Sequence, residues 1–274
     1  MLLKSSFAIR VVGLSTLLSS SCFSAVTASL DFESETLNDF FSDSVTDWSQ
    51  DQTNPSAFGS EIPLAYISTT DFGFGSSNTG HLGTQFGNLS PNASTTVTGA
   101  FNFVGVGTAP NPQVTLNLAI IDPGSASFPG RDAFSVAVTD GVSATIAQID
   151  FTPDALDDTL WDVAVGVNGA PVSSSLASVT VGSAYEFKIE FGATSTSFLY
   201  GSAVGGATVG IDTLGSASGS QMAEIEMTHN PLAAEGTSAN TFVFDNIVAS
   251  VVPEPSSCAL LLLCLPLFAA RRRP

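Results

Sequence analysis

The chain has 274 residues, of which 44% are hydrophobic and 12% are charged, a composition that suits one large folded domain and excludes disorder for most of the sequence. Seven Lys and Arg residues stand against 25 Asp and Glu residues, and the net charge of −18 excludes nucleic-acid binding as a main role because such a surface repels phosphate backbones. The 24 Gly and 20 Phe residues, with few residues suited to solvated helices, predict an all-β domain rich in turns.

The first 28 residues have the three parts of a secretory signal peptide. Lys4 and Arg10 precede an apolar stretch over residues 11–18, and Val26 and Ala28 then satisfy the small-x-small rule of signal peptidase. We expect a signal helix in residues 1–28 and cleavage after Ala28. The alternative, a buried N-terminal helix, would join a basic segment to a body that has almost no basic residues.

The body, residues 29–252, shows the period-two alternation of half-buried strands. In residues 185–191 (YEFKIEF) the apolar side chains share one face and the three charged side chains share the other. Turn signals such as Asp140-Gly141 and Asn168-Gly169 separate similar runs at residues 114–121, 134–138, 144–151, 161–167, 223–228 and 242–251. The pattern predicts about ten to twelve short strands.

Strands at this spacing, each with one polar face, predict two antiparallel sheets stacked as a sandwich. A body of this length suits a jelly roll better than a minimal immunoglobulin-type domain, so we expect one domain. Residues 42–63, which are acidic, and residues 73–94, which are rich in Gly, Asn and Ser, are predicted to be long loops.

Three short strings look like elements of concanavalin A-like and carbohydrate-binding jelly rolls: LDFE at residues 30–33, GHLG at residues 80–83 and FVFDN at residues 242–246. The resemblance implies a sandwich fold and glycan binding. A jelly roll brings its first and last strands together, so we expect Asp31, Glu33 and Asp245 to meet as oxygen ligands of a structural Ca²⁺. The alternative is that these three acids are solvated on an outer face, as most acids are in an acidic protein.

Two further groups of residues carry candidate chemistry. Trp48, in a polar segment, is the better candidate for stacking on a sugar ring as a ligand-binding residue, whereas Trp161 is expected in the core. Glu224 and Glu226 share one strand face, and their strand distantly resembles the Glu-x-Asp-x-x-Glu strand of laminarinase-like sandwiches. Because Glu226 and His229 stand where that motif has Asp and its second Glu, we expect no catalytic residues, and a secreted glycosidase is the second alternative.

The last 22 residues contain three parts in one order: Pro253-Glu254-Pro255, an uncharged stretch over residues 258–270, and Arg271-Arg272-Arg273. This order resembles the PEP-CTERM sorting signal of Gram-negative bacteria, which implies cleavage by an exosortase-type membrane protease. The apolar stretch spans about 20 Å as a helix, short of the roughly 30 Å hydrocarbon core, so residues 253–274 are predicted to be a transient inner-membrane anchor. The positive-inside preference keeps the arginines cytoplasmic and places the body outside. The alternative is a permanent transmembrane helix that is never cut.

Removal of both ends leaves Arg131 and Lys188 as the basic residues of the body against 24 acidic ones, a net charge of −22. Cys22, Cys258 and Cys264 all lie in the two ends, so the body has no disulfide. The sequence predicts a non-enzymatic protein exported to the cell surface or the biofilm matrix, with a body that binds an extracellular polysaccharide. The first alternative is a purely structural acidic surface protein without a ligand.

Overall fold

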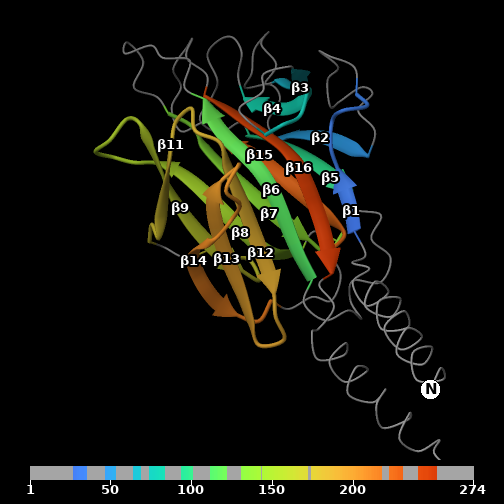
Figure 1. The fold of residues 1–274 in the computed structure, drawn as a ribbon, viewed down its shortest axis with the longest axis vertical. Helices are drawn as coiled ribbons and strands as arrows, with labels where there is room; N and C mark the ends of the chain where they lie inside the picture. The colour runs from blue at the N-terminus through green and yellow to red at the C-terminus, as the bar shows by residue number, and fades with distance from the viewer. Residues whose placement is uncertain are drawn as a thin grey trace, which may run out of the picture.

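The computed structural model describes residues 27–35, 47–53, 64–68, 74–83, 94–100, 112–121, 131–142, 144–171, 174–217, 222–230 and 240–251. Within these ranges the chain forms sixteen strands and no helix, and the strands make two antiparallel sheets (Figure 1). The predicted all-β, two-sheet antiparallel sandwich is confirmed. None of the described residues belongs to a helix long and apolar enough to cross a membrane.

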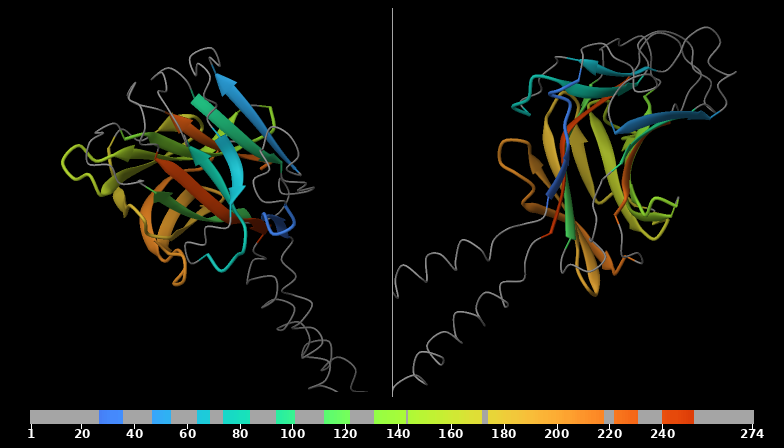
Figure 2. Two further views of the ribbon diagram at one scale, coloured as in Figure 1. Left: turned by 90° about the horizontal axis from the view of Figure 1, so that it is seen from above. Right: turned by 90° about the vertical axis from the view of Figure 1, so that its right-hand side faces the viewer.

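Sheet A contains the first and last strands of the described chain. Its order is β14 (Val209–Gly215), β13 (Ser195–Ser202), β12 (Tyr185–Phe191), β6 (Pro112–Ile121), β16 (Thr241–Val251), β4 (Thr79–Gly83) and β3 (Leu64–Ser68), and β1 (Thr27–Leu30) also pairs with β16. Leu30 is paired with Ile247 and Thr27 with Ser250, so β1 (blue) runs beside β16 (red) in Figures 1 and 2. The two ends of the body therefore lie side by side.

Sheet B is the second layer of the sandwich. Its order is β10 (Ala170–Pro171), β9 (Leu160–Val167), β8 (Thr145–Pro153), β7 (Ala133–Thr139), β15 (Glu224–Asn230), β5 (Ser94–Ala100) and β2 (Trp48–Thr53), and β11 (Ala177–Thr180) also pairs with β9. The chain passes repeatedly from one sheet to the other, because β6 lies in sheet A while β5 and β7 lie in sheet B.

The core forms between the sheets because alternate side chains of each strand point inward. In β15, for example, Ile225, Met227 and His229 are buried, while the residues between them are only half-buried. The largest fully buried side chains are Phe32, Phe134, Phe151, Trp161, Phe187, Phe198, Phe242 and Phe244. Each contributes about 1.5–3 kcal/mol by burial, which stabilises a fold that has no disulfide.

Two turns confirm the sequence signals. Asn168 and Gly169 both have positive φ, 56° and 71°, and they join β9 to β10 as a two-residue hairpin of the type that Asn-Gly favours. Gly141 has a φ of 77°, and the Asp140 carboxylate accepts hydrogen bonds from the backbone amides of Val142 and Ala144. Local side-chain chemistry thus sets where these strands end.

The two predicted long loops are wrong in part, because each contains a strand. β2 lies within residues 42–63 and β4 lies within residues 73–94. The predicted C-terminal segment 253–274 and residues 1–26 lie outside the described residues. β1 includes Thr27 and Ala28, so cleavage after Ala28, which stays a prediction, would leave Ser29 and Leu30 to pair with β16.

Candidate functional site

The three predicted calcium ligands lie in one region of the fold. Asp31 and Glu33 belong to the turn that follows β1, and Asp245 lies on β16, which pairs with β1. The register of β16 against β6 shifts between Asp245 and Val248, and Asn246 has a φ of 49°. This irregularity turns the strand locally, as bulges do.

Hydrogen bonds tie the β1 turn to the segment that precedes β4. Glu33 Oε1 accepts from the backbone amides of Ser77 at 2.5 Å and Asn78 at 3.3 Å. The Asn78 side-chain amide donates to the carbonyl oxygens of Phe32 and Glu35. These contacts hold Glu33 beside segment 74–78, whose Phe74 carbonyl accepts from the side chain of Asn246.

Asp245 has a carboxylate that the described residues leave unsatisfied. Its exposed fraction is 0%, and neither carboxylate oxygen has a partner in hydrogen-bonding geometry within the described part of the chain. Its pKa is raised to about 6, chiefly by burial and to a smaller extent by the charges of Glu33 and Asp31, while Ser76 and the Asn246 amide are near enough to offset part of the rise. The hydroxyl of Ser76 is also buried without a partner in those ranges.

A buried, unpaired carboxylate beside further acids is an arrangement that a hard cation stabilises. Within the described ranges, no three His, Cys, Asp or Glu side chains are grouped closely enough to hold a metal by themselves. Calcium takes carboxylate and hydroxyl oxygens; Asp245 and Glu33 carry the first kind, and Ser76 carries the second. Asp245 is the acid of this region whose carboxylate oxygens lack a partner among the described residues. Asp31 contributes less directly, since its Oδ1 accepts from the Glu33 amide.

Trp48 is buried, whereas stacking on a sugar ring needs an exposed indole. Trp48 is 9% exposed and packs between Phe32 and Phe244, with ring centroids 5.4 and 5.6 Å away. Gly99 lies directly opposite Trp48 on β5, and a Cβ there would come within 3.0 Å of the indole and 2.7 Å of Leu30. The glycine leaves the space that lets the indole point inward, so Trp48 is a core residue.

The two glutamates of β15 point away from the core, as the sequence predicts. Glu224 and Glu226 are half-buried on the outer face of sheet B, and the Thr139 hydroxyl donates to Glu224 at 3.2 Å. Burial raises the pKa of Glu226, and the charge of Glu224 raises it further.

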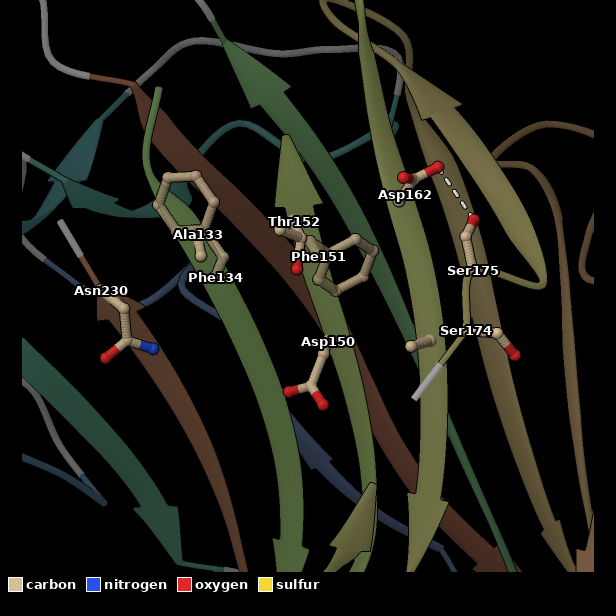
Figure 3. A pocket seen from close by; sticks show the side chains of 10 residues that line it. Ala133, Phe134, Asp150, Phe151, Thr152, Asp162, Ser174, Ser175 and Asn230 are labelled. Atoms are coloured by element: carbon tan, nitrogen blue, oxygen red, sulfur yellow. Dashed lines mark hydrogen bonds between the residues drawn. The ribbon is translucent and has the colours of Figure 1, made fainter. Parts of the chain in front are cut away.

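The same outer face contains a pocket that sequence reasoning missed. We call it the sheet-B pocket; it encloses about 370 Å³ between β15, β7, β8, β9 and the segment before β11 (Figure 3). Its lining residues are Ala133, Phe134, Asp150, Phe151, Thr152, Asp162, Ala164, Ser174, Ser175 and Asn230. The rings of Phe134 and Phe151 are buried in the core, so small, hydroxyl, amide and carboxylate groups face the pocket.

Hydrogen bonds orient the two carboxylates of the pocket. The Gln148 side chain donates to Asp150 Oδ1 at 2.6 Å, and the Ser175 hydroxyl donates to Asp162 Oδ1 at 2.8 Å, the dashed line in Figure 3. Burial raises the pKa of Asp150, and the Gln148 hydrogen bond opposes that rise. Only cross-strand register brings these residues together, so spacing along the chain gave no signal.

A buried polar cluster lies under the end of the pocket. His229 Nε2 is 2.8 Å from Asp132 Oδ2, the His229 ring stacks on Phe134, and the Trp161 indole donates to the Asp132 carbonyl. The Arg131 guanidinium lies 5.1 Å from the Trp161 ring centroid. The same guanidinium donates to the carbonyls of Asp154, Asp157 and Leu160, so it fixes the β8–β9 loop.

Comparison with known proteins gives likenesses of shape. No family model matches the chain, and no curated protein sequence is similar to it. Among solved structures, the catalytic domain of a GH131 β-glucanase from Podospora anserina has a TM-score of 0.48 at 11% identity, over 78% of this chain and 84% of that chain. The CBM2 module of the evolved Dit protein of Lactobacillus casei BL23 phage J-1 has a TM-score of 0.46 at 12% identity, over 82% and 97% of the two chains. Winged bean acidic lectin has a TM-score of 0.45 at 8% identity, over 84% and 100%. At these values the likenesses carry no argument about what this chain binds.

Proposed function

We propose that the body is a non-catalytic glycan-binding sandwich whose binding site is the sheet-B pocket. The observation that carries this proposal is the pocket itself: a hollow of about 370 Å³ on the outer face of sheet B, whose lining includes the small residues Ala133 and Ala164. Hydroxyl, amide and carboxylate groups also line the pocket. A sugar offers many hydroxyl donors and acceptors, which such groups bind with defined orientation.

A glycan array of the purified full chain tests this proposal. The chain is kept in a polyoxyethylene detergent, because sugar-based detergents would compete. We expect retention of some glycans, and loss of that retention in Ala164→Tyr, which places a large side chain in the pocket. The matched control is Ala137→Tyr. Ala137 lies on β7, on the same outer face of sheet B as Ala164, but outside the pocket lining. Equal retention by both variants would place binding elsewhere, and retention of no glycan would refute the proposal.

The proposal extends to the finer fold and to delivery. We take the sandwich to be a jelly roll of the concanavalin A-like type, exported by residues 1–28 and sorted to the cell surface by residues 253–274. The support for delivery is in the sequence, where Val26 and Ala28 follow a basic and apolar leader and an Arg cluster follows the C-terminal apolar stretch. Deletion of residues 253–274 is expected to release the body into the medium or periplasm. Unchanged surface retention of the truncated chain would contradict the sorting proposal.

Calcium is the cofactor that we propose for the terminal-strand region. The support is the buried, unpaired carboxylate of Asp245 beside Ser76 and Glu33. Calorimetry of the full chain is expected to show saturable binding of Ca²⁺ that Asp245→Asn abolishes. If Mg²⁺ gave the same heats as Ca²⁺, and if Asp245→Asn gave the same heats as the wild type, the cations would instead be attracted diffusely to the acidic surface.

A glycosidase is the second candidate function, and a specific observation supports it. Glu224 and Glu226 alternate on the outer face of β15, about 7 Å apart, and burial raises the pKa of Glu226 as a general acid requires. Release of reducing ends from an array-positive glycan, abolished by Glu224→Gln or Glu226→Gln, would favour this function over simple binding.

A further inference from the structure

The sheet-B pocket is lined by negative groups. Among the described residues that line it, Asp150 and Asp162 are the charged ones and none is Lys, Arg or His. The two basic residues of the body are engaged elsewhere: Arg131 binds three backbone carbonyls, and Lys188 pairs with Glu190 at 2.8 Å on sheet A. A ligand that enters the pocket therefore meets carboxylates without competing cations.

The two carboxylates point away from each other, so each can bind a separate group of one ligand (Figure 3). Asp150 pairs across the strands with Ala164, and Asp162 pairs with Thr152, so the two acids are diagonal neighbours on β8 and β9. Their Cβ atoms are about 7 Å apart in this arrangement. Each carboxylate has one oxygen bound by a neighbour, Gln148 or Ser175, while the Oδ2 atoms accept no hydrogen bond from the described residues.

The pocket also lacks the usual means of binding a neutral sugar ring. Stacking needs an aromatic face, and the rings of Phe134 and Phe151 are only 1% and 0% exposed. Recognition must then come from hydrogen bonds and charge. A uronic acid would bring a third carboxylate to Asp150 and Asp162, which repel it.

We propose that the sheet-B pocket binds the protonated amine of an amino sugar, so the ligand is a glycan with free amino groups, such as a de-N-acetylated hexosamine polymer. This inference rests on the proposed glycan binding at the same site. The free Oδ2 atom of each aspartate can accept a hydrogen bond from an ammonium group, and the hydroxyl of Thr152, opposite Asp162, offers a further acceptor. Charge-assisted hydrogen bonds of this kind are shorter and stronger than neutral ones.

The rest of the molecule favours the same ligand. A body with a net charge of −22 attracts a polycation from a distance and repels an acidic polysaccharide. A bound ammonium also stabilises the ionised form of half-buried Asp150, whose pKa burial raises. Calcium fits the pocket less well, because it takes about six to eight oxygen ligands and the described lining brings only two carboxylates.

The test compares four oligosaccharides of equal length on the full chain at pH 6 in EDTA: glucosamine, N-acetylglucosamine, glucose and galacturonate oligomers. We expect the glucosamine oligomer to bind at least tenfold more tightly than the others, with an affinity that falls as salt rises. Asp150→Asn and Asp162→Asn should each weaken that binding about tenfold, the loss of one charge-assisted hydrogen bond. The charge-matched control is Asp158→Asn, an exposed residue of the β8–β9 loop outside the pocket lining, which should bind as the wild type does.

The outcomes separate this inference from the function on which it rests. Tighter binding of a neutral, N-acetylated or acidic oligomer, lost in Ala164→Tyr, would overturn the amine inference and retain the glycan site. Equal weakening by Asp158→Asn would show general attraction to an acidic surface and overturn it too. Binding of none of the four would overturn both. The melting temperature of each variant, within a few degrees of the wild type, confirms that the isosteric Asn variants are folded.

Discussion

Replacement of Asp245 by Asn should stabilise the calcium-free protein, an unusual result for a fully buried residue. Burial is the main cause that raises the pKa of this carboxyl from 3.8 to about 6. Each pKa unit is worth about 1.4 kcal/mol, so the ionised carboxylate costs the folded state about 3 kcal/mol at pH 8. Asparagine has the same shape without the charge. A gain of this size raises the melting temperature by about 6–12 °C in a domain of this length.

The assay is denaturant unfolding of wild type and Asp245→Asn at pH 8, first in EDTA and then in Ca²⁺. In EDTA the variant should have the larger free energy of unfolding. In Ca²⁺ this difference should shrink or change sign, because a Ca²⁺ concentration 100-fold above Kd adds about 2.7 kcal/mol to the free energy of unfolding of the wild type alone. The pKa of the folded state is the higher one, so stability falls as pH rises from about 4 to about 6, and the advantage of Asn should vanish near pH 4. A variant less stable than the wild type in EDTA at pH 8 would refute this reasoning.

Three other substitutions test the fold around the sites. Arg131→Met should lower the free energy of unfolding by about 2–4 kcal/mol, because three backbone carbonyls lose a charged donor. Arg131→Lys should lower it by less in the same unfolding assay. Burial lowers the pKa of His81 to about 4. As the pH falls below 6.5, the free energy of unfolding of the wild type should therefore decrease relative to that of His81→Gln by about 1.4 kcal/mol per pH unit. A difference that does not change with pH would contradict this. Trp48→Ala should cost about 3–5 kcal/mol by leaving a cavity in the core, with the glycan-array profile unchanged where the protein stays folded.

Alternation along the chain predicted the strands because each sheet of the sandwich has one buried face. β12 matches its predicted bounds; β6, β9 and β16 begin one or two residues before their predicted runs, and β8 begins one residue later and ends two residues later than predicted. β2 and β4 escaped prediction because they are short and polar or glycine-rich. β2 pairs with β5, where Gly99 has no side chain and so leaves space for the indole of Trp48; this contact joins residues far apart in the sequence.

The terminal acids were predictable because a sandwich pairs its first and last strands, and the structure brings Asp31 and Glu33 beside β16 as that reasoning requires. The unpaired state of Asp245 was not predictable, since it depends on how segment 74–78 covers the strand. The sheet-B pocket was likewise invisible in the sequence. Asp150 and Asp162 become neighbours only through the register of β8 against β9, which no local spacing encodes.

The most direct test of the central claim is amide chemical-shift mapping of the isotope-labelled full chain as a bound glycan is added. Glycan binding at the sheet-B pocket predicts that the perturbed amides cluster at residues 133–134, 150–152, 162–164 and 174–175, with sheet A unchanged. Perturbations that instead concentrate on β13 and β14, or that spread evenly over the acidic surface, would contradict it.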